Sequence, residues 1–133
     1  MLSGSCLCGA IRYEVEGDLG PIVCCHCSMC RKAQGSAFAT NAPVEAARFR
    51  IVSGEDRLRR YASSPGKWRC FCSSCGSPII SQRDGSAVIR LRIGTLDSRL
   101  AARPTAHIHV ASKAEWFDIL DDLPRHPELE PGR

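Results

Sequence analysis

The stretch "CFCSSCG", residues 70–76, sets three cysteines at a C-x-C-x-x-C spacing and follows them with a glycine. An earlier stretch, "CHCSMC" at residues 25–30, repeats this spacing, and "CLC" at residues 6–8 has its first half. The C-x-x-C part is typical of zinc-binding turns, in which two thiolates face one ion. The C-x-C part puts two side chains on one face of an extended strand, and we expect Cys6 and Cys8 to lie on such a strand. The three stretches therefore predict metal sites that tie distant segments together.

The cysteines number nine, an odd count that cannot pair completely within one chain. The first 17 residues, "MLSGSCLCGAIRYEVEG", have no basic region followed by an apolar run, so we expect no signal peptide. No apolar stretch approaches the roughly 20 residues of a membrane-spanning helix. We therefore expect a cytoplasmic chain without a membrane partner, whose cysteines stay reduced or bind metal rather than form disulfides.

The composition of the 133 residues is that of one globular domain, with 44% hydrophobic and 6% aromatic residues. The net charge is +4, and the arginines are scattered, with only Arg59 and Arg60 adjacent to each other. A nucleic-acid-binding surface has denser basic clusters interleaved with aromatic residues. We therefore expect no nucleic-acid partner, and the charge suits a small anionic ligand.

Short alternating segments between turns dominate the chain, which indicates β structure. Strands are predicted at residues 11–15, 49–52, 58–61, 67–72, 78–82, 87–93 and 107–110. Helix is scarce, with single turns expected near residues 29–34 and 113–120. The predicted fold class is mostly β, with antiparallel sheets and little helix. The proline-rich, polar end at residues 125–133 is predicted to be a flexible C-terminal tail.

The cysteine spacing predicts one closed metal site. Cys6 and Cys8 supply only two sulfurs, and the C-x-x-C turn at Cys72 and Cys75 supplies two more. Four sulfurs complete the tetrahedron of a structural zinc site. Such a site would tie the N-terminal segment to a turn in the second half of the chain.

Three thiols remain together at Cys25, Cys27 and Cys30, one ligand short of a tetrahedral site. Either the protein supplies no fourth ligand, which leaves a position for substrate, or one of these residues does: Cys24, His26, His107 or His109. A closed second site, completed by Cys24 or Cys70, is the structural alternative. Adjacent strand residues point to opposite faces, which makes Cys24 an awkward partner for Cys25. Because three ligands hold zinc less securely than four, we expect partial occupancy of this second zinc.

An open zinc on three thiolates suits a soft ligand, and an incoming thiol is the best match. Zinc would deprotonate that thiol and hold it beside an electrophilic carbon. Arg31 and Lys32 directly follow Cys30 and, with Lys67, are the predicted contacts for substrate carboxylates. Hydrolytic deamination is disfavoured, because the only H-x-E, at residues 126–128, lies after every cysteine. The predicted reaction class is formation or cleavage of a C–S bond.

Longer stretches carry a resemblance to a known family. They are "GSCLCGAIRYEV" at residues 4–15, "CHCSMCRK" at 25–32, "SGEDRLRRYASSPGKWRCFCSSCGSPI" at 53–79 and "HIHVASKAEWFDILDDLP" at 107–124. On these stretches the chain resembles the glutathione-dependent formaldehyde-activating enzyme family, which also includes centromere protein V. The composite pattern covers most of the chain and is specific, whereas the cysteine spacing alone is shared with unrelated zinc proteins.

The resemblance implies a β-tent-like fold stapled by two zinc ions, with residues 1–124 as a single zinc-binding catalytic domain. It implies a structural zinc on Cys6, Cys8, Cys72 and Cys75, and a catalytic zinc on Cys25, Cys27 and Cys30. Family members are associated with adding glutathione to formaldehyde, which gives S-(hydroxymethyl)glutathione, and are classed as carbon–sulfur lyases. The expected partners are thus a small thiol such as glutathione and an aldehyde. Centromere protein V implies the alternative, a non-enzymatic zinc-stabilised protein-interaction module.

Overall fold

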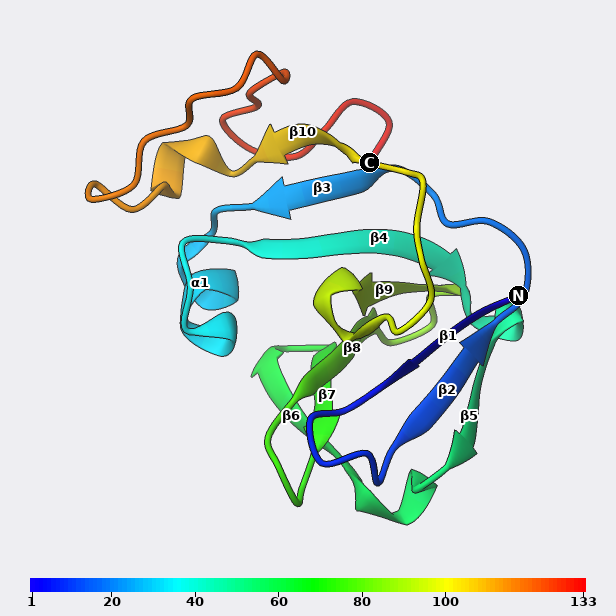
Figure 1. Ribbon diagram of the computed structural model, residues 1–133. Helices are drawn as coiled ribbons and strands as arrows, with labels where there is room; N and C mark the ends of the chain where they lie inside the picture. The colour runs from blue at the N-terminus through cyan, green and yellow to red at the C-terminus, as the bar shows by residue number, and fades with distance from the viewer.

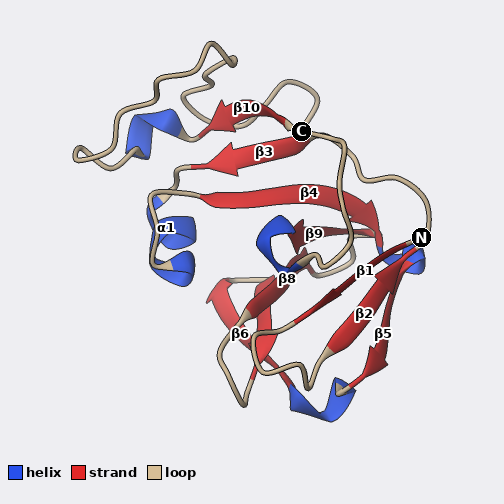
Figure 2. Ribbon diagram, viewed as in Figure 1, coloured by secondary structure: helices blue, strands red, loops and turns tan.

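Two β-sheets build the protein, which is described over residues 1–133 by a computed structural model (Figures 1 and 2). The smaller sheet has three strands in the order β1-β2-β5: β1 (Leu2–Ser5), β2 (Arg12–Val15) and β5 (Phe49–Ser53). The larger sheet has seven strands in the order β10-β3-β4-β9-β8-β7-β6. Its strands are β3 (Ile22–Cys25), β4 (Ala39–Glu45), β6 (Leu58–Ser64), β7 (Lys67–Cys72), β8 (Pro78–Arg83), β9 (Val88–Arg92) and β10 (Pro104–Ile108).

Neighbouring strands are antiparallel except for β10 and β3, which run parallel. The helical elements are α1 (Ser28–Gln34) and four short 3-10 turns: η1 (Ala46–Arg48), η2 (Glu55–Arg57), η3 (Ile93–Thr95) and η4 (Val110–Ser112). The predicted fold class, mostly β with antiparallel sheets and little helix, is confirmed. No helix has both the length and the apolar character needed to cross a membrane.

The main hydrophobic core lies between the two sheets. Ile89 and Leu91 of β9 pack in one cluster with Tyr13 and Val15 of β2. Each of these side chains is at most 2% exposed, and burial of such a side chain contributes about 1.5–3 kcal/mol. Because side chains alternate along a strand, the intervening residues of β9 point to the other face of the large sheet. That other face carries the polar site described below.

The segment near residues 113–120, predicted to be a single turn of helix, forms a hydrogen-bonded turn that is not helical. The segment after η4 makes a single turn, closed by the hydrogen bond from Phe117 N to Ala114 O. The Lys113 ammonium donates to the carbonyl oxygens of Ala114 and Phe117, so these acceptors are satisfied without a continued helix. A single turn does not extend into a helix on its own, because helix nucleation is unfavourable in short segments.

Cys6 and Cys8 do not lie on a strand, contrary to the prediction. β1 ends at Ser5, and both cysteines lie in the turn that leads to β2. Gly9 N donates to Cys6 O at 3.0 Å, which folds this turn back on itself. Gly9 has φ 79°, a left-handed conformation that glycine adopts without strain.

The C-terminal segment runs along the outer edge of β10. His107 N donates to Pro124 O, and His126 N donates to His107 O, both at 2.9 Å. Further on, His109 N donates to Glu128 O at 2.7 Å. These bonds give residues 124–128 fixed partners on the sheet edge. The flexibility predicted for residues 125–133 stays a prediction. The hydrogen bonds of residues 126 and 128 to β10 and the turn after it restrict motion in the first part of this segment.

Candidate functional site

Four cysteine sulfurs gather between the β1–β2 turn and the end of β7. The Sγ atoms of Cys6, Cys8, Cys72 and Cys75 all lie within 4.8 Å of one another. Cys6 and Cys8 are 3.6 Å apart at their sulfurs, and Cys8 and Cys72 are 3.9 Å apart. The structure thus brings together the four residues predicted for the closed site. The group joins the small sheet to the large one.

Local hydrogen bonds shape this four-sulfur group. Gly76 N donates to Cys72 O at 2.7 Å, and Gly76 adopts φ 81°, so the chain turns tightly after Cys75. The Ser77 hydroxyl lies 3.3 Å from Cys75 Sγ, and hydrogen bonding by Ser77 lowers the pKa of Cys75 to about 5. Ile11 N donates to Cys6 Sγ at 3.2 Å. Backbone and hydroxyl donors around the sulfurs favour the thiolate form that a metal ion binds.

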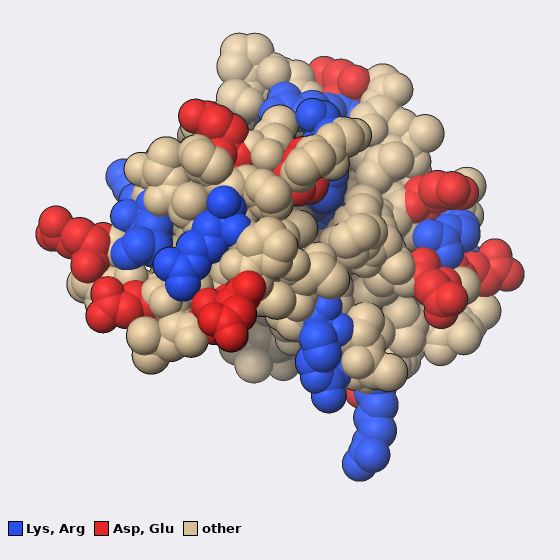
Figure 3. Space-filling model, turned by 90° about the horizontal axis from the view of Figure 1, so that it is seen from above, with Lys and Arg blue, Asp and Glu red and all other residues tan.

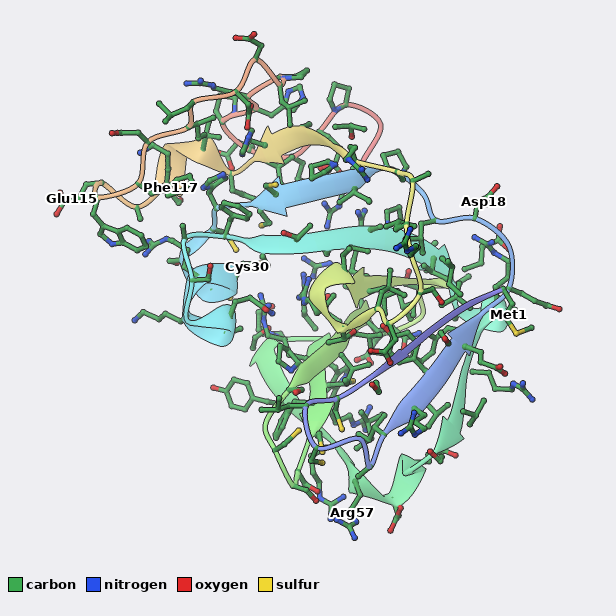
Figure 4. All side chains as sticks on the ribbon, in the orientation of Figure 1. Met1, Asp18, Cys30, Arg57, Glu115 and Phe117 are labelled. Carbon is green, nitrogen blue, oxygen red and sulfur yellow. The ribbon has the colours of Figure 1, made fainter.

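Three further sulfurs gather where β3 leads into α1. Cys25 ends β3, Cys27 is the N-cap of α1, and Cys30 lies in the first turn of that helix. Their Sγ atoms lie within 4.8 Å of one another, and Cys30 N donates to Cys27 Sγ at 3.3 Å. Figure 4 shows Cys30 beside α1 and below β4. A strand end followed at once by a helix start brings the three thiols together.

The histidines and Cys24, considered as fourth ligands, make other contacts. His26 Nε2 lies 2.8 Å from His107 Nδ1, and His107 Nε2 lies 2.9 Å from Asp121 Oδ2. Both histidines are at most 3% exposed, and burial, then the charge of His107, lowers the pKa of His26 to about 4. Cys24 lines a cavity of about 320 Å³ with His107, apart from the three sulfurs. Burial raises the pKa of Cys24 to about 11.

His109 is the remaining candidate for a fourth ligand. It lines the cavity that contains the three sulfurs, but its ring nitrogens do not join the group of ligand atoms within 4.8 Å. Its backbone is left-handed, with φ 54°, and its Nδ1 lies 4.0 Å from a carboxylate oxygen of Glu128. The group of potential ligand atoms therefore consists of the three sulfurs alone.

Arginines surround the three-sulfur group. The guanidinium Nη atoms of Arg69 lie 3.8 and 3.9 Å from Cys30 Sγ. Hydrogen bonds from Cys25 and Cys27, and then the charges of Arg92 and Arg69, hold the pKa of Cys30 well below its usual value. The three sulfurs open into a cavity of about 70 Å³. This environment stabilises negative charge at the sulfurs.

Of the predicted anion contacts, the structure brings only Lys67 to this cavity. Arg31 and Lys32 lie on α1 and do not line the cavity, and Lys32 is exposed to solvent. The sequence reasoning missed Arg90 and Arg92, which line the cavity from β9. The sequence feature that could have revealed them is the alternation in "VIRLRI" at residues 88–93. It puts two arginines on one face of an otherwise apolar strand.

Both sulfur groups could hold a metal ion. The donors are cysteine sulfurs alone, drawn from turns and a helix start with hydrogen-bond donors directed at them. Soft thiolate ligands of this kind are consistent with zinc. The first group has the four ligands of a closed site, and the second has three.

Comparisons with known proteins place relatives beside this chain. The model of the family described as "Glutathione-dependent formaldehyde-activating enzyme" matches residues 1–112. A Halomonas elongata protein, "Putative glutathione-dependent formaldehyde-activating enzyme", is 32% identical in an alignment of 129 positions that covers 90% of this chain and 81% of that one. A Schizosaccharomyces pombe protein described as an uncharacterized lyase is 33% identical over 76 residues, 57% of this chain and 53% of that one.

A crystal structure of a Rhodobacter sphaeroides protein has a similar fold. Its TM-score is 0.63 at 26% identity, and the match covers 74% of this chain and 91% of that one. The family model covers both sulfur groups, the strands that carry them and helix α1. The sequence resemblance is thereby confirmed, and this chain belongs to the glutathione-dependent formaldehyde-activating enzyme family.

Proposed function

We propose that this protein is a zinc-dependent carbon–sulfur lyase that forms and cleaves thiol adducts, with S-(hydroxymethyl)glutathione, made from glutathione and formaldehyde, as the adduct. One observation carries the proposal. The sulfurs of Cys25, Cys27 and Cys30 lie within 4.8 Å of one another and open into a cavity lined by cationic side chains. A structural site needs a fourth protein ligand, whereas a catalytic site keeps that position for substrate. The family and the lyase-named relative support an enzyme of this class.

The two sulfur groups take different roles in this proposal. A structural zinc is assigned to Cys6, Cys8, Cys72 and Cys75, and a catalytic zinc to Cys25, Cys27 and Cys30. When bound at the second group, zinc supplies a soft Lewis acid that favours the thiolate form of an incoming thiol. With three ligands against four, the second zinc is the one held at partial occupancy.

The reaction needs little rearrangement of atoms. The thiol sulfur attacks the carbonyl carbon of formaldehyde, a C–S bond forms, and the carbonyl π electrons move to the oxygen, which takes up the proton that the thiol loses. Cleavage is the same sequence in reverse. Arg69 and Arg92 stabilise negative charge around Cys30, and we assign the attack of the thiol sulfur to this place. Lys67 binds a carboxylate of the thiol substrate, and Arg31 and Lys32 are proposed as further anion contacts outside the cavity.

Zinc content and X-ray absorption of the purified protein, without and with glutathione, test the proposal. We expect between one and two zinc ions per chain, and a sulfur shell that changes when glutathione is added. Cys27→Ser should lose the second zinc and formation of the adduct, followed by NMR, while Cys24→Ala should keep both. Two zinc ions in four-sulfur shells that do not respond to glutathione would instead favour a zinc-stabilised protein-interaction module.

A further inference from the structure

A cationic hollow adjoins the three-sulfur cavity on the open face of the large sheet. Its volume is about 210 Å³, and it shares five lining residues with the cavity of about 70 Å³ that contains the sulfurs. The shared residues are Lys67, Ser81, Arg83, Arg90 and Arg133. Four of these five are cationic, and no Asp or Glu lines either space. A ligand in the hollow can therefore reach toward the sulfurs without leaving positively charged surroundings.

Strand register explains why these cations share one face. Lys67 of β7 lies opposite Arg83 of β8, and Ser81 of β8 lies opposite Arg90 of β9. Residues that face each other across antiparallel strands point to the same side of the sheet, as do residues two apart on one strand. Arg92 is therefore on the side of Arg90, opposite Asn41 of β4. Three central strands, β7, β8 and β9, supply most of the lining of the hollow, and Arg133 at the end of the chain adds a further cation.

Arg92 is buried without a hydrogen-bond partner. It is 4% exposed, it lines the three-sulfur cavity, and its guanidinium makes no hydrogen bond and no ion pair with a carboxylate. The negative charges that act on it are those of Cys30, Cys25 and Cys27. Asn41 lines the same cavity, is 3% exposed, and its Oδ1 also has no partner. The guanidinium donors of Arg92 therefore have no acceptor within the chain, and a carboxylate that enters the cavity can accept from them.

Glu130 is the one carboxylate that pairs with the cations of the hollow. Its Oε1 lies 3.7 Å from Arg90 Nη2 and 3.0 Å from Arg133 Nη1. The hydrogen bond from His109 N to Glu128 O fixes the chain two residues before Glu130, which lies beside Arg90 and Arg133 without lining the hollow itself. This segment lies beyond residue 112, where the family match ends. An internal carboxylate thus occupies one of the positions that a ligand carboxylate would take.

We propose that this hollow and the adjoining three-sulfur cavity form the carboxylate subsite of the thiol substrate, in which Arg90 and Arg92 bind a substrate carboxylate and Glu130 competes with it for Arg90. The identity of the substrate as a thiol rests on the proposed function. The subsite selects peptide-like thiols with free carboxylates over neutral thiols and aminothiols. Bidentate arginine–carboxylate pairs supply the affinity and the orientation, and Lys67 and Arg83 add charge. A substrate carboxylate must bind Arg90 more strongly than Glu130 does before it can displace Glu130.

Binding of S-methylglutathione to the zinc-loaded full chain, measured by calorimetry, tests the subsite without catalysis. The methylated sulfur cannot form a thiolate, so affinity reports the carboxylates. We expect Arg92→Met to weaken binding at least tenfold and Arg92→Lys to weaken it less. Glu130→Gln should tighten binding about threefold to tenfold, and this gain should disappear when Arg90→Met is added. Arg99→Gln, an exposed change elsewhere, is the matched control for lost charge and should leave binding unchanged.

Zinc content and circular dichroism of each variant confirm that its fold is intact. Equal binding of S-methylglutathione by the unmodified protein and Arg92→Met, or no binding to either, would overturn the subsite even if glutathione is turned over. Tight, Arg92-dependent binding in a protein that never forms the adduct would support the subsite and contradict the proposed function.

Discussion

The two sulfur groups use the same local spacing and reach different environments. In the four-sulfur group, the C-x-x-C lies at the end of a strand, and its two sulfurs meet those of Cys6 and Cys8 near the N-terminus. In the three-sulfur group, the C-x-x-C starts a helix, so all three sulfurs come from one six-residue segment and face the cations of the large sheet. The same C-x-x-C motif thus has a different outcome on a strand end and on a helix start. The secondary-structure element that carries the motif decides whether the fold supplies all four sulfurs or leaves one position for a ligand.

Breaking the four-sulfur group should cost the protein its fold. Cys72→Ser removes a proposed zinc ligand that is 0% exposed and belongs to the sulfur group between the two sheets. A structural zinc contributes on the order of 10 kcal/mol, as much as the whole stability of a typical domain. We expect Cys72→Ser to lack a cooperative thermal transition in circular dichroism. A variant that melts at the temperature of the unmodified protein would remove the structural role from this group.

A stepwise loss of metal should separate the two groups within one sample. With increasing chelator, the three-sulfur group should release its zinc first, because it has one ligand fewer. At this step the activity should fall by more than about 100-fold, which exceeds the loss caused by mutating a residue that only hydrogen-bonds to a metal ligand. The far-UV circular dichroism should stay unchanged. A second release should coincide with unfolding. Simultaneous release and unfolding in a single step would show that the two groups are equivalent.

Glycine substitutions should show how tightly each region is packed. A Cβ on Gly54, which has φ 78°, would lie 2.0 Å from the backbone oxygen of Ala10, close to the turn that carries Cys8. A Cβ on Gly35, which ends α1 with φ 61°, would have nothing within 4 Å. We expect Gly54→Ala to lower the free energy of unfolding by about 3 kcal/mol or more, and Gly35→Ala by about 1–2 kcal/mol, the left-handed strain alone. Urea titrations that give equal losses would contradict the difference.

The smallest effect concerns Tyr13, which packs in the core between the sheets. Its hydroxyl lies 2.7 Å from Thr95 Oγ1, and burial raises its pKa to about 12. The folded state therefore keeps a proton that the unfolded state loses above pH 10, so stability falls as the pH rises from 10 to 12. Two pKa units correspond to about 2.7 kcal/mol at full effect. Tyr13→Phe should lose about 1 kcal/mol at neutral pH and be less sensitive above pH 10.

The matched measurement is the difference in unfolding free energy between the two proteins at pH 8, 10 and 11. A difference that does not change with pH would show that Tyr13 ionises equally in both states. Because the comparison is between two proteins at each pH, other groups that titrate in this range contribute equally to both.

Sequence reasoning predicted how the cysteines group together better than it predicted what surrounds them. The division of the cysteines followed from ligand counting, since the number of sulfurs per segment is a local property. Arg90 and Arg92 were missed because their meeting with Cys25 depends on the order of strands in the large sheet, which is not a local property. Strands β1, β3 and β4 also escaped prediction. Their burial comes from neighbours far along the chain, and β3, for example, is buried at all four positions and shows no alternation.

The course of the C-terminal segment along β10 also covers one edge of the large sheet. A sheet edge exposes unpaired N–H and C=O groups that can recruit strands from other molecules. At one edge of the large sheet, residues 124–128 occupy hydrogen-bonding groups of β10 and the turn after it. At the opposite edge, β6 carries the exposed charges of Arg59 and Arg60, and Arg60 lies 4.0 Å from the ring of Trp68. A chain cut at residue 123 would keep one protected edge and lose the other, and aggregation would begin at β10.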